Sequence, residues 1–248
     1  MRLNGKTAIV TGGASGFGAG IVRKFVAEGA RVMIADINAD AAVAMADEIG
    51  NATIAQMVDV ADAGSVGIMT DTAMDALGQV DILVNNAGIT HLPKPMEEVE
   101  EDEFDRVNAV NMKSVYLTAR RLVPHMKTRG TGAILNIAST AGVSPRPNLN
   151  WYNASKGWMI TATKAMAVEL APAGVRVNAL CPVAGETPLL ASFMGEDTPE
   201  MRAKFLSTIP IGRFSTPEDM GNAACFLCSE EASMVTGVAM EVDGGRCI

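Results

Sequence analysis

A tyrosine and a lysine four residues apart, in the segment Tyr152-Asn153-Ala154-Ser155-Lys156, are the residues of this chain best suited to acid–base chemistry. Residues at that spacing share one face of a helix, so both side chains can reach a common ligand. An ammonium beside a phenol favours the phenolate and lowers its pKa towards the range that a general acid or base needs. The pair is weak on its own, because the same spacing occurs by chance on many solvated helix faces.

The composition of the 248-residue chain predicts one soluble α/β domain. Apolar residues make up 48% of it and aromatic residues only 4%, as expected of a buried sheet that helices cover on both faces. A net charge of -8 argues against a surface for nucleic acid or anionic membranes. The sequence shows no apolar run long enough to span a bilayer and no signal-peptide cleavage region, so we expect a cytoplasmic protein.

The four cysteines are too few and too irregularly spaced for a disulfide framework. Cys225 and Cys228 form a C-x-x-C pattern, but they lie within a helical pattern at 219–229 and have apolar neighbours. A redox or zinc site is the alternative to a packed helix face, and it lacks a second pair of ligands. We therefore expect a packed helix face and no bound metal.

Short apolar runs alternate with longer helical patterns along the whole chain. The predicted strands are 7–11, 31–36, 53–58, 82–86, 133–137, 176–180 and 238–242, and the predicted helices are 16–28, 39–49, 64–77, 104–126, 152–170 and 219–229. This alternation is typical of a doubly wound parallel sheet of about seven strands, with helices on both faces, in a single domain. An irregular stretch at about 183–212 is predicted to be a substrate loop, with a mobile surface excursion as the alternative.

A glycine-rich turn, Thr11-Gly12-Gly13-Ala14-Ser15-Gly16-Phe17-Gly18, joins the first predicted strand to the first predicted helix. Glycines permit a tight turn and a close approach of backbone to ligand, and helix amides can receive a pyrophosphate. Asp36 ends the second predicted strand, where a carboxylate can bind both adenosine ribose hydroxyls and repel a 2'-phosphate. No Arg or Lys lies in the turn or directly after Asp36, so the sequence favours NAD over NADP, with helix capping as the alternative role of Asp36.

Ordered motifs make the whole chain resemble the short-chain dehydrogenase/reductase family, in its branch of this length. They are TGGASGFG at 11–18, Asp59-Val60, NNAG at 85–88, VNMKS at 110–114, Ser139 after AILNIA, YNASK at 152–156, RVNALCP ending at Pro182, and VDGG at 242–245. Each motif is modest, but the complete ordered set does not arise readily by chance. The resemblance implies a Rossmann-type fold, a nicotinamide cofactor and a dehydrogenase or reductase activity.

The resemblance further implies a catalytic tetrad of Asn111, Ser139, Tyr152 and Lys156. Tyr152 would protonate a carbonyl oxygen during reduction, or take the alcohol proton during oxidation, while Ser139 holds the same oxygen. Lys156 would lower the pKa of the tyrosine and bind the nicotinamide ribose. Asn111 would hold a water that links Lys156 to bulk solvent.

The same resemblance carries a set of cofactor contacts onto this chain. They are Gly12, Ser15, Gly16, Phe17, Gly18, Asp36, Asp59, Val60, Asn85, Ala87, Gly88, Tyr152, Lys156, Pro182, Gly185 and Thr187. Asp59 would reach the adenine edge, or else cap the following helix. Val183 stands where the family commonly has a glycine, and a β-branched residue restricts the backbone on the nicotinamide side.

The substrate is expected between the segment 139–152, the loop after 85–88 and the stretch that begins at Thr187. Candidate lining residues are His91, Ser139, Thr140, Arg146, Asn148, Trp151, Leu189, Phe193 and Met194. Arg146 could pair with a substrate carboxylate or sulfonate through its planar fork, or be an exposed arginine between two prolines. His91 is interpreted as a surface or rim residue, because Tyr152 already fills the acid/base role.

The favoured function is an NAD-dependent oxidoreductase that moves a hydride between the cofactor and a secondary alcohol or ketone, a small-molecule partner. The alternatives are an NADP-dependent ketoreductase of the 3-oxoacyl type, a lyase, isomerase or dehydratase on the same fold, and a nucleotide-sensing module. A nucleotide-sensing module of this family usually lacks the tyrosine or the lysine, and this chain has both. The resemblance alone implies a homotetramer paired through the helices at 104–126 and 152–170.

Overall fold

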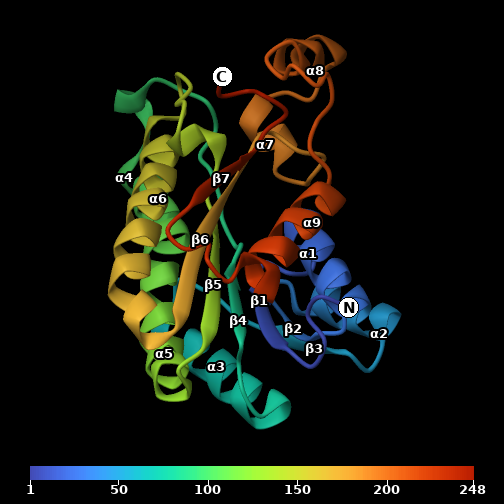
Figure 1. Cartoon of the computed structure of the whole chain (residues 1–248). Helices are drawn as coiled ribbons and strands as arrows, with labels where there is room; N and C mark the ends of the chain where they lie inside the picture. Colours follow the sequence, from blue (N-terminus) through green and yellow to red (C-terminus); the bar gives the residue numbers. More distant parts are fainter.

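Seven parallel strands form one sheet in the order β3-β2-β1-β4-β5-β6-β7 in the computed structural model, which describes all 248 residues (Figure 1). The strands are β1 (Thr7–Thr11), β2 (Arg31–Asp36), β3 (Thr53–Met57), β4 (Ile82–Asn85), β5 (Gly132–Ile137), β6 (Val175–Pro182) and β7 (Ala239–Val242). The strand order reverses between β1 and β4, which is where doubly wound sheets bind their ligands.

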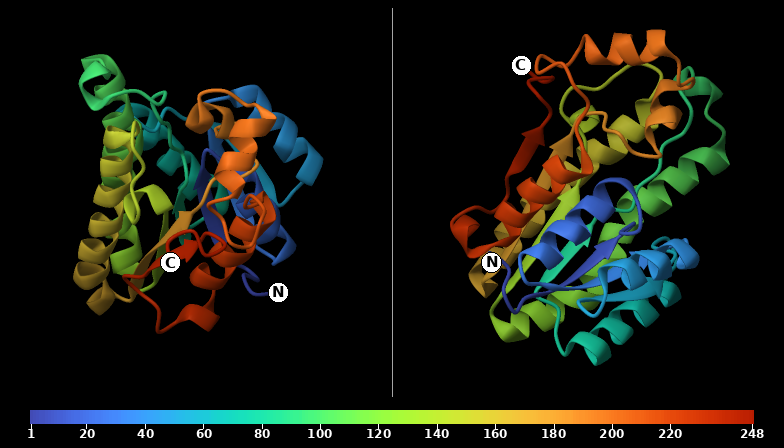
Figure 2. Two further views of the ribbon diagram at one scale, coloured as in Figure 1. Left: turned by 90° about the horizontal axis from the view of Figure 1, so that it is seen from above. Right: turned by 90° about the vertical axis from the view of Figure 1, so that its right-hand side faces the viewer.

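Helices cover both faces of the sheet, as the left view of Figure 2 shows from above. They are α1 (Gly16–Ala27), α2 (Ala39–Ile49), α3 (Ala63–Leu77), α4 (Glu101–Asn108), α5 (Ser114–Arg129), α6 (Asn150–Leu170) and α9 (Pro217–Cys228). Successive strand residues point to opposite faces, so Val10 belongs to the core cluster that contains residues of α1, α2 and α9, while Ile9 belongs to the cluster that contains residues of α3, α5 and α6. The predicted doubly wound single domain is confirmed.

Two predicted segments differ from the structure. The helix predicted at 104–126 is present as one unbroken helical run, but a π-helical segment, Ala109–Lys113, lies in its middle and divides it into α4 and α5. Single-turn π-helical segments of this kind occur frequently at functional sites. The stretch at 183–212 contains two short helices, α7 (Leu190–Met194) and α8 (Pro199–Leu206), and Figures 1 and 2 place α8 at the same end of the molecule as the C-terminus.

The C-x-x-C pattern lies on a packed helix face. Cys225 and Cys228 of α9 are buried in the core cluster that also contains Ile21, Val22 and Phe25 of α1. This agrees with the packing expected from their apolar neighbours. Separately, none of the helices combines the length and the hydropathy that crossing a membrane requires.

Candidate active site

A cavity of about 440 Å³ lies at the carboxyl ends of the strands. Six strands each contribute the residue that directly follows them, namely Gly12, Ile37, Val58, Asn86, Ala138 and Val183. Parallel strands end at the same edge of a sheet, so residues far apart in the sequence meet there. The fold therefore brings the motifs of the two halves of the chain to one cavity.

The glycine-rich turn forms one end of this cavity. Gly12 and Gly16 have φ values of +59° and +50°, which side chains with a Cβ rarely adopt. A Cβ on Gly18 would lie 2.0 Å from the carbonyl oxygen of Gly12, so only glycine lets α1 begin this close to the turn. Ser15 caps α1 without a side-chain hydrogen bond, and no acidic residue occupies the first turn. The first-turn amides, which lack intrahelical partners, fit an anionic pyrophosphate.

Asp36 faces the cavity next to this turn. One carboxylate oxygen accepts a hydrogen bond from the Ala14 amide and the other from the Asn38 amide, both at 3.0 Å. Asn38, rather than Asp36, caps α2, because its side chain accepts from the Ala41 amide. Each carboxylate oxygen of Asp36 retains further acceptor capacity towards the cavity.

The two asparagines that follow β4 have different positions. Asn85 is 4% exposed and its amide nitrogen donates to Asn136 at 2.9 Å, so it lies beneath the cavity rather than in its wall. Asn86 lines the cavity, and its amide nitrogen donates to the carbonyl oxygens of Thr11 and Gly12 at 2.9 Å. Asn86 therefore holds the glycine-rich turn in place.

Most of the predicted cofactor residues line the cavity, whereas Gly18 and Asn85 do not. Those that do are Gly12, Ser15, Gly16, Phe17, Asp36, Asp59, Val60, Ala87, Gly88, Tyr152, Lys156, Pro182, Gly185 and Thr187. Asp59 is exposed, and Asp62 caps α3 in its place. The helix-capping alternative therefore holds neither for Asp36 nor for Asp59.

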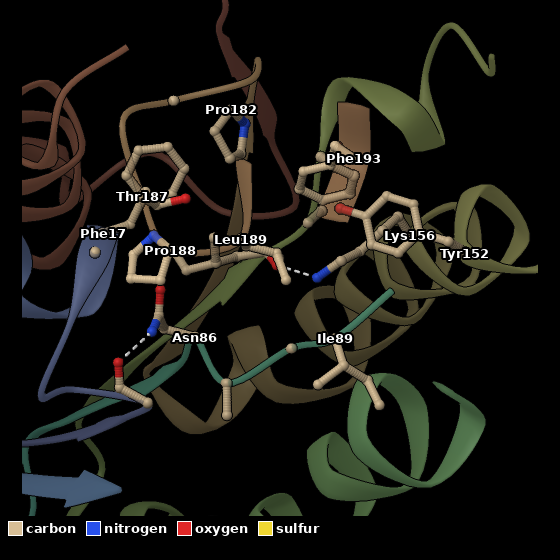
Figure 3. A pocket seen from close by; sticks show the side chains of 18 of the residues that line it. Phe17, Asn86, Ile89, Tyr152, Lys156, Pro182, Thr187, Pro188, Leu189 and Phe193 are labelled. Carbon is tan, nitrogen blue, oxygen red and sulfur yellow. Dashed lines mark hydrogen bonds between the residues drawn. The ribbon is translucent and has the colours of Figure 1, made fainter. Parts of the chain in front are cut away.

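Tyr152 and Lys156 lie side by side on α6, and the ring of Phe193 of α7 lies next to the tyrosine ring (Figure 3). The ring centroids of Tyr152 and Phe193 are 5.1 Å apart. The Lys156 ammonium lies 5.9 Å from the tyrosine ring centroid and donates to the Ile137 carbonyl oxygen at 2.8 Å. Both side chains of the pair are buried, at 4% exposure each.

Burial moves the pKa of both groups towards the neutral form. It raises the pKa of Tyr152 to about 12, although a hydrogen bond with Ser139 and the charge of Arg146 act in the opposite direction. It lowers the pKa of Lys156 to about 8. The sequence predicted that Lys156 lowers the pKa of Tyr152. In the structure the Lys156 ammonium is directed at the Ile137 carbonyl oxygen, and the neighbours that lower the pKa of Tyr152 are Ser139 and Arg146.

Ser139 and Asn111 complete the predicted tetrad around this pair. The Ser139 hydroxyl oxygen accepts from the Ala141 amide at 3.0 Å, and its hydrogen can be donated to the Tyr152 oxygen or to a substrate oxygen. Asn111 is fully buried in the π-helical segment, and its amide nitrogen donates to the hydroxyl of Ser155 at 3.0 Å. A Cβ on Gly88 would lie 3.3 Å from the Lys156 ammonium nitrogen and 3.4 Å from the Asn111 side-chain oxygen, so these two groups border the same small space.

Val183 fits the cavity wall without a strained backbone, since Asn148 is the only residue other than glycine with a positive φ. Its side chain packs in a separate apolar cluster with Leu190 and Met194 of α7. At Gly185, a Cβ would lie 2.3 Å from the Phe17 ring, so a side chain there would have to displace Phe17.

The predicted substrate residues separate into two groups. Those that line the cavity are Ser139, Thr140, Arg146, Leu189 and Phe193. Those outside it are His91, Asn148, Trp151 and Met194, each held by other contacts. The surface or rim position predicted for His91 was wrong, because His91 is 2% exposed and bonds to the Leu92 carbonyl oxygen. Met194 packs with Val183.

Asn148 and Trp151 are held away from the cavity by contacts with the segment 94–104. Asn148 is exposed, and its carbonyl oxygen accepts from the Lys94 amide at 3.0 Å. The Trp151 ring packs edge-on against Phe104, with centroids 5.4 Å apart, and its indole nitrogen donates to the Met96 carbonyl oxygen.

Sequence reasoning missed several apolar lining residues, including Leu149 and Phe205. Phe205 belongs to α8, within the stretch predicted to be irregular. Its aromatic side chain within the predicted substrate loop was the one signal that the sequence offered.

Comparison with known proteins agrees with this geometry. Residues 12–246 match the family model described as enoyl-(acyl carrier protein) reductase. The chain is 51% identical to a 4-formylbenzenesulfonate dehydrogenase of Comamonas testosteroni, with all of both chains covered. The chain belongs to the short-chain dehydrogenase/reductase family. It is 40% identical to an NAD(+)-dependent 2-dehydro-3-deoxy-L-rhamnonate dehydrogenase of a Sphingomonas strain, over 99% of this chain and 96% of the relative.

Solved structures place this short-chain dehydrogenase/reductase among the same relatives. A Brucella melitensis 3-ketoacyl-(acyl-carrier-protein) reductase complexed with NADH is 51% identical, with a TM-score of 0.95, and the match covers 99% of this chain and 100% of the other. Levodione reductase has the same TM-score at 27% identity, with 99% of each chain covered. The protein is an oxidoreductase that binds a nicotinamide cofactor.

Proposed function

We propose that this enzyme uses NAD to interconvert a secondary alcohol and a ketone, with Tyr152 as general acid and base. The observation that carries the proposal is one cavity with Asp36 at one end and Ser139, Tyr152 and Lys156 at the other. NADH absorbance tests it, with secondary alcohols, polyols, hydroxy acids and a 3-oxoacyl thioester as substrates. Reduction of the thioester alone would favour the acyl-reductase alternative.

The residues of the cavity fit a dinucleotide. The positive-φ glycines and the first-turn amides of α1 would hold the pyrophosphate, and Asp36 would accept hydrogen bonds from the adenosine ribose. The fixed charge of Asp36 disfavours a 2'-phosphate. A relative named for NAD(+) and a structural neighbour solved with NADH support the same choice.

Replacing Asp36 with alanine should lower kcat/KM for NAD by roughly 10- to 100-fold, because hydrogen bonds to a charged group contribute about 1.5–3 kcal/mol. The kcat/KM for NADP should fall less, so the preference for NAD over NADP should become smaller. Steady-state kinetics with both cofactors measure this. Asp40→Ala removes an exposed carboxylate four residues away and should change neither value. A wild-type enzyme with higher kcat/KM for NADP would contradict the NAD proposal.

The bound cofactor would supply or accept the hydride. Ser139 would donate its hydroxyl hydrogen to the substrate oxygen, while Tyr152 gives that oxygen a proton during reduction and removes one during oxidation. Lys156 would bind the nicotinamide ribose and, with Asn111, border the path by which the tyrosine exchanges protons with solvent. The packing of Phe193 on Tyr152 excludes water from one side of the phenol.

We also propose a homotetramer, because α5 and α6 expose apolar side chains that a monomer leaves in water. Tyr116 is 53% exposed, Trp158 37% and Val168 80%. Light scattering on the purified protein should give four times the chain mass of 25.9 kDa. A mass of one chain at micromolar concentration would contradict this proposal.

A further inference from the structure

Charge is distributed unevenly along the cavity. Its lining contains four charged residues, of which Asp36 and Asp59 lie at the glycine-turn end and Lys156 and Arg146 at the end that holds Tyr152. The Lys156 ammonium is directed at the Ile137 carbonyl oxygen. Arg146 is therefore the charged group available to a substrate at the catalytic end.

The position of Arg146 is fixed from two sides. Its carbonyl oxygen accepts a 2.7 Å hydrogen bond from the Asn153 side chain, and Asn153 follows Tyr152 on α6. Its guanidinium lies over the ring of Phe205, with the central carbon 4.7 Å from the ring centroid. These contacts hold an ordered, half-buried cation in the wall next to the catalytic tyrosine.

This cation has no counter-charge within the chain. The charged neighbours that act on the Arg146 guanidinium include a second cation, Arg246, and no carboxylate. Burial and the charge of Arg246 lower the pKa of Arg146. The Nε atom of Arg246 is itself buried without a hydrogen-bond partner. A partly buried cation beside a like charge carries a desolvation cost that an anion would offset.

The remaining wall at this end is apolar and aromatic. Leu149, Leu189, Phe193 and Phe205 line it, and Phe193 packs against Tyr152. A planar apolar substrate body fits such a surface. Its reactive carbonyl would lie at Tyr152 and Ser139, and its far end at Arg146.

We propose that Arg146 is an anion-binding residue for the substrate, which carries a carboxylate or sulfonate on an apolar body. The planar guanidinium fork donates two parallel hydrogen bonds to either oxyanion, and the charge of Arg246, which acts on Arg146, adds positive potential. The inference rests on the proposed function, because it names the substrate class of the same cavity. The sequence left open that Arg146 is an exposed arginine between two prolines, and this alternative is wrong, because the side chain is half-buried in the cavity wall.

The test measures binding without turnover, because a ketone cannot react with oxidised cofactor. Calorimetry follows 4-acetylbenzoate, 4-acetylbenzenesulfonate and the neutral methyl 4-acetylbenzoate into the NAD-loaded protein. We expect at least one anion to bind about tenfold or more tightly than the ester. Comparing the two anions separates carboxylate from sulfonate. This readout remains informative even if Tyr152 is shown not to transfer the proton.

Arg146→Gln should weaken binding of the anions by roughly 10- to 100-fold and leave the ester within about twofold. Arg146→Lys should restore part of the loss, because it keeps the charge but not the fork. Phe205→Ala removes the stacking partner and should weaken the ester as well as the anions. Arg23→Gln, at an exposed arginine paired with Glu48, is the control and should change nothing.

Equal losses for anions and ester in Arg146→Gln would show that the arginine only packs α8 onto the wall, and would overturn the proposal. Failure of both anions to bind the wild-type protein would overturn it too. Unchanged NAD affinity in each variant shows that the cavity is intact, so a selective loss is assigned to the substrate end.

Discussion

Replacement of Tyr152 by phenylalanine should lower kcat for alcohol oxidation by roughly 10²- to 10⁴-fold, the usual contribution of a positioned general acid or base. The ring and its contact with Phe193 are retained, so only the phenol oxygen is lost. The affinity for NAD should stay within a few-fold, because the glycine-rich turn and Asp36 are untouched. NADH formation and a cofactor titration measure the two effects separately.

The chain contains only one other tyrosine, which provides a matched control. Tyr116 lies on α5 outside the cavity, on the face proposed for the tetramer contact, and Tyr116→Phe keeps its ring, so kcat should be unchanged. An unchanged rate in Tyr152→Phe would remove the tyrosine from the proton-transfer step. The site would then have to use Ser139 or a water as the acid and base.

The pH dependence gives this prediction a direction. Oxidation needs the deprotonated phenol as base, and burial raises the pKa of Tyr152 to about 12, so the oxidation rate should rise with pH across the neutral range. Reduction needs the protonated phenol and should be flat there. Arg146→Gln removes a charge that lowers this pKa, so the rise in oxidation should move to higher pH.

Local signals explain why one end of the site could be predicted from the sequence. Each glycine of the turn has a positive φ or leaves no room for a Cβ. The amino-acid type at each of these positions therefore indicates the local backbone geometry directly. Asp36 was placed correctly in the wall because it ends a strand at the edge where parallel strands meet. Short-range spacing likewise placed Tyr152 and Lys156 on one helix face.

Contacts between distant segments explain what the sequence could not supply. Asn85 and Asn86 are adjacent, but only the structure shows that the first bonds to Asn136 inside the sheet and the second to the glycine-rich turn. Trp151 lies next to Tyr152, yet its ring turns towards Phe104 of α4. Phe205 reaches the wall because α8 packs back over the site. The substrate end depends on such packing, so its residues were the least predictable.

The change of Lys156 to methionine should nearly abolish activity without destabilising the protein at neutral pH. We expect kcat/KM to fall by roughly 10²-fold or more, because the variant loses the group proposed to bind the ribose and relay protons. The lysine is 4% exposed, and burial lowers its pKa from 10.5 to about 8, which corresponds to a charge-burial cost of about 3 kcal/mol. Methionine removes that cost but leaves the Ile137 carbonyl oxygen unpaired, at about 1–3 kcal/mol, so the two effects nearly cancel.

The stability difference between wild type and Lys156→Met should therefore change with pH in a fixed direction. Below pH 8 both the folded and the unfolded wild type hold the lysine proton, and the burial cost is complete. Between pH 8 and 10.5 the folded state loses this proton while the unfolded state keeps it, so the wild type gains up to about 3 kcal/mol over the variant. Urea unfolding of both proteins across this range measures the gain, and Lys164→Met on the exposed face of α6 should show none. A stability difference between wild type and Lys156→Met that does not change with pH would mean that the Lys156 ammonium is not desolvated. Burial could then not explain how Lys156 exchanges protons near neutral pH.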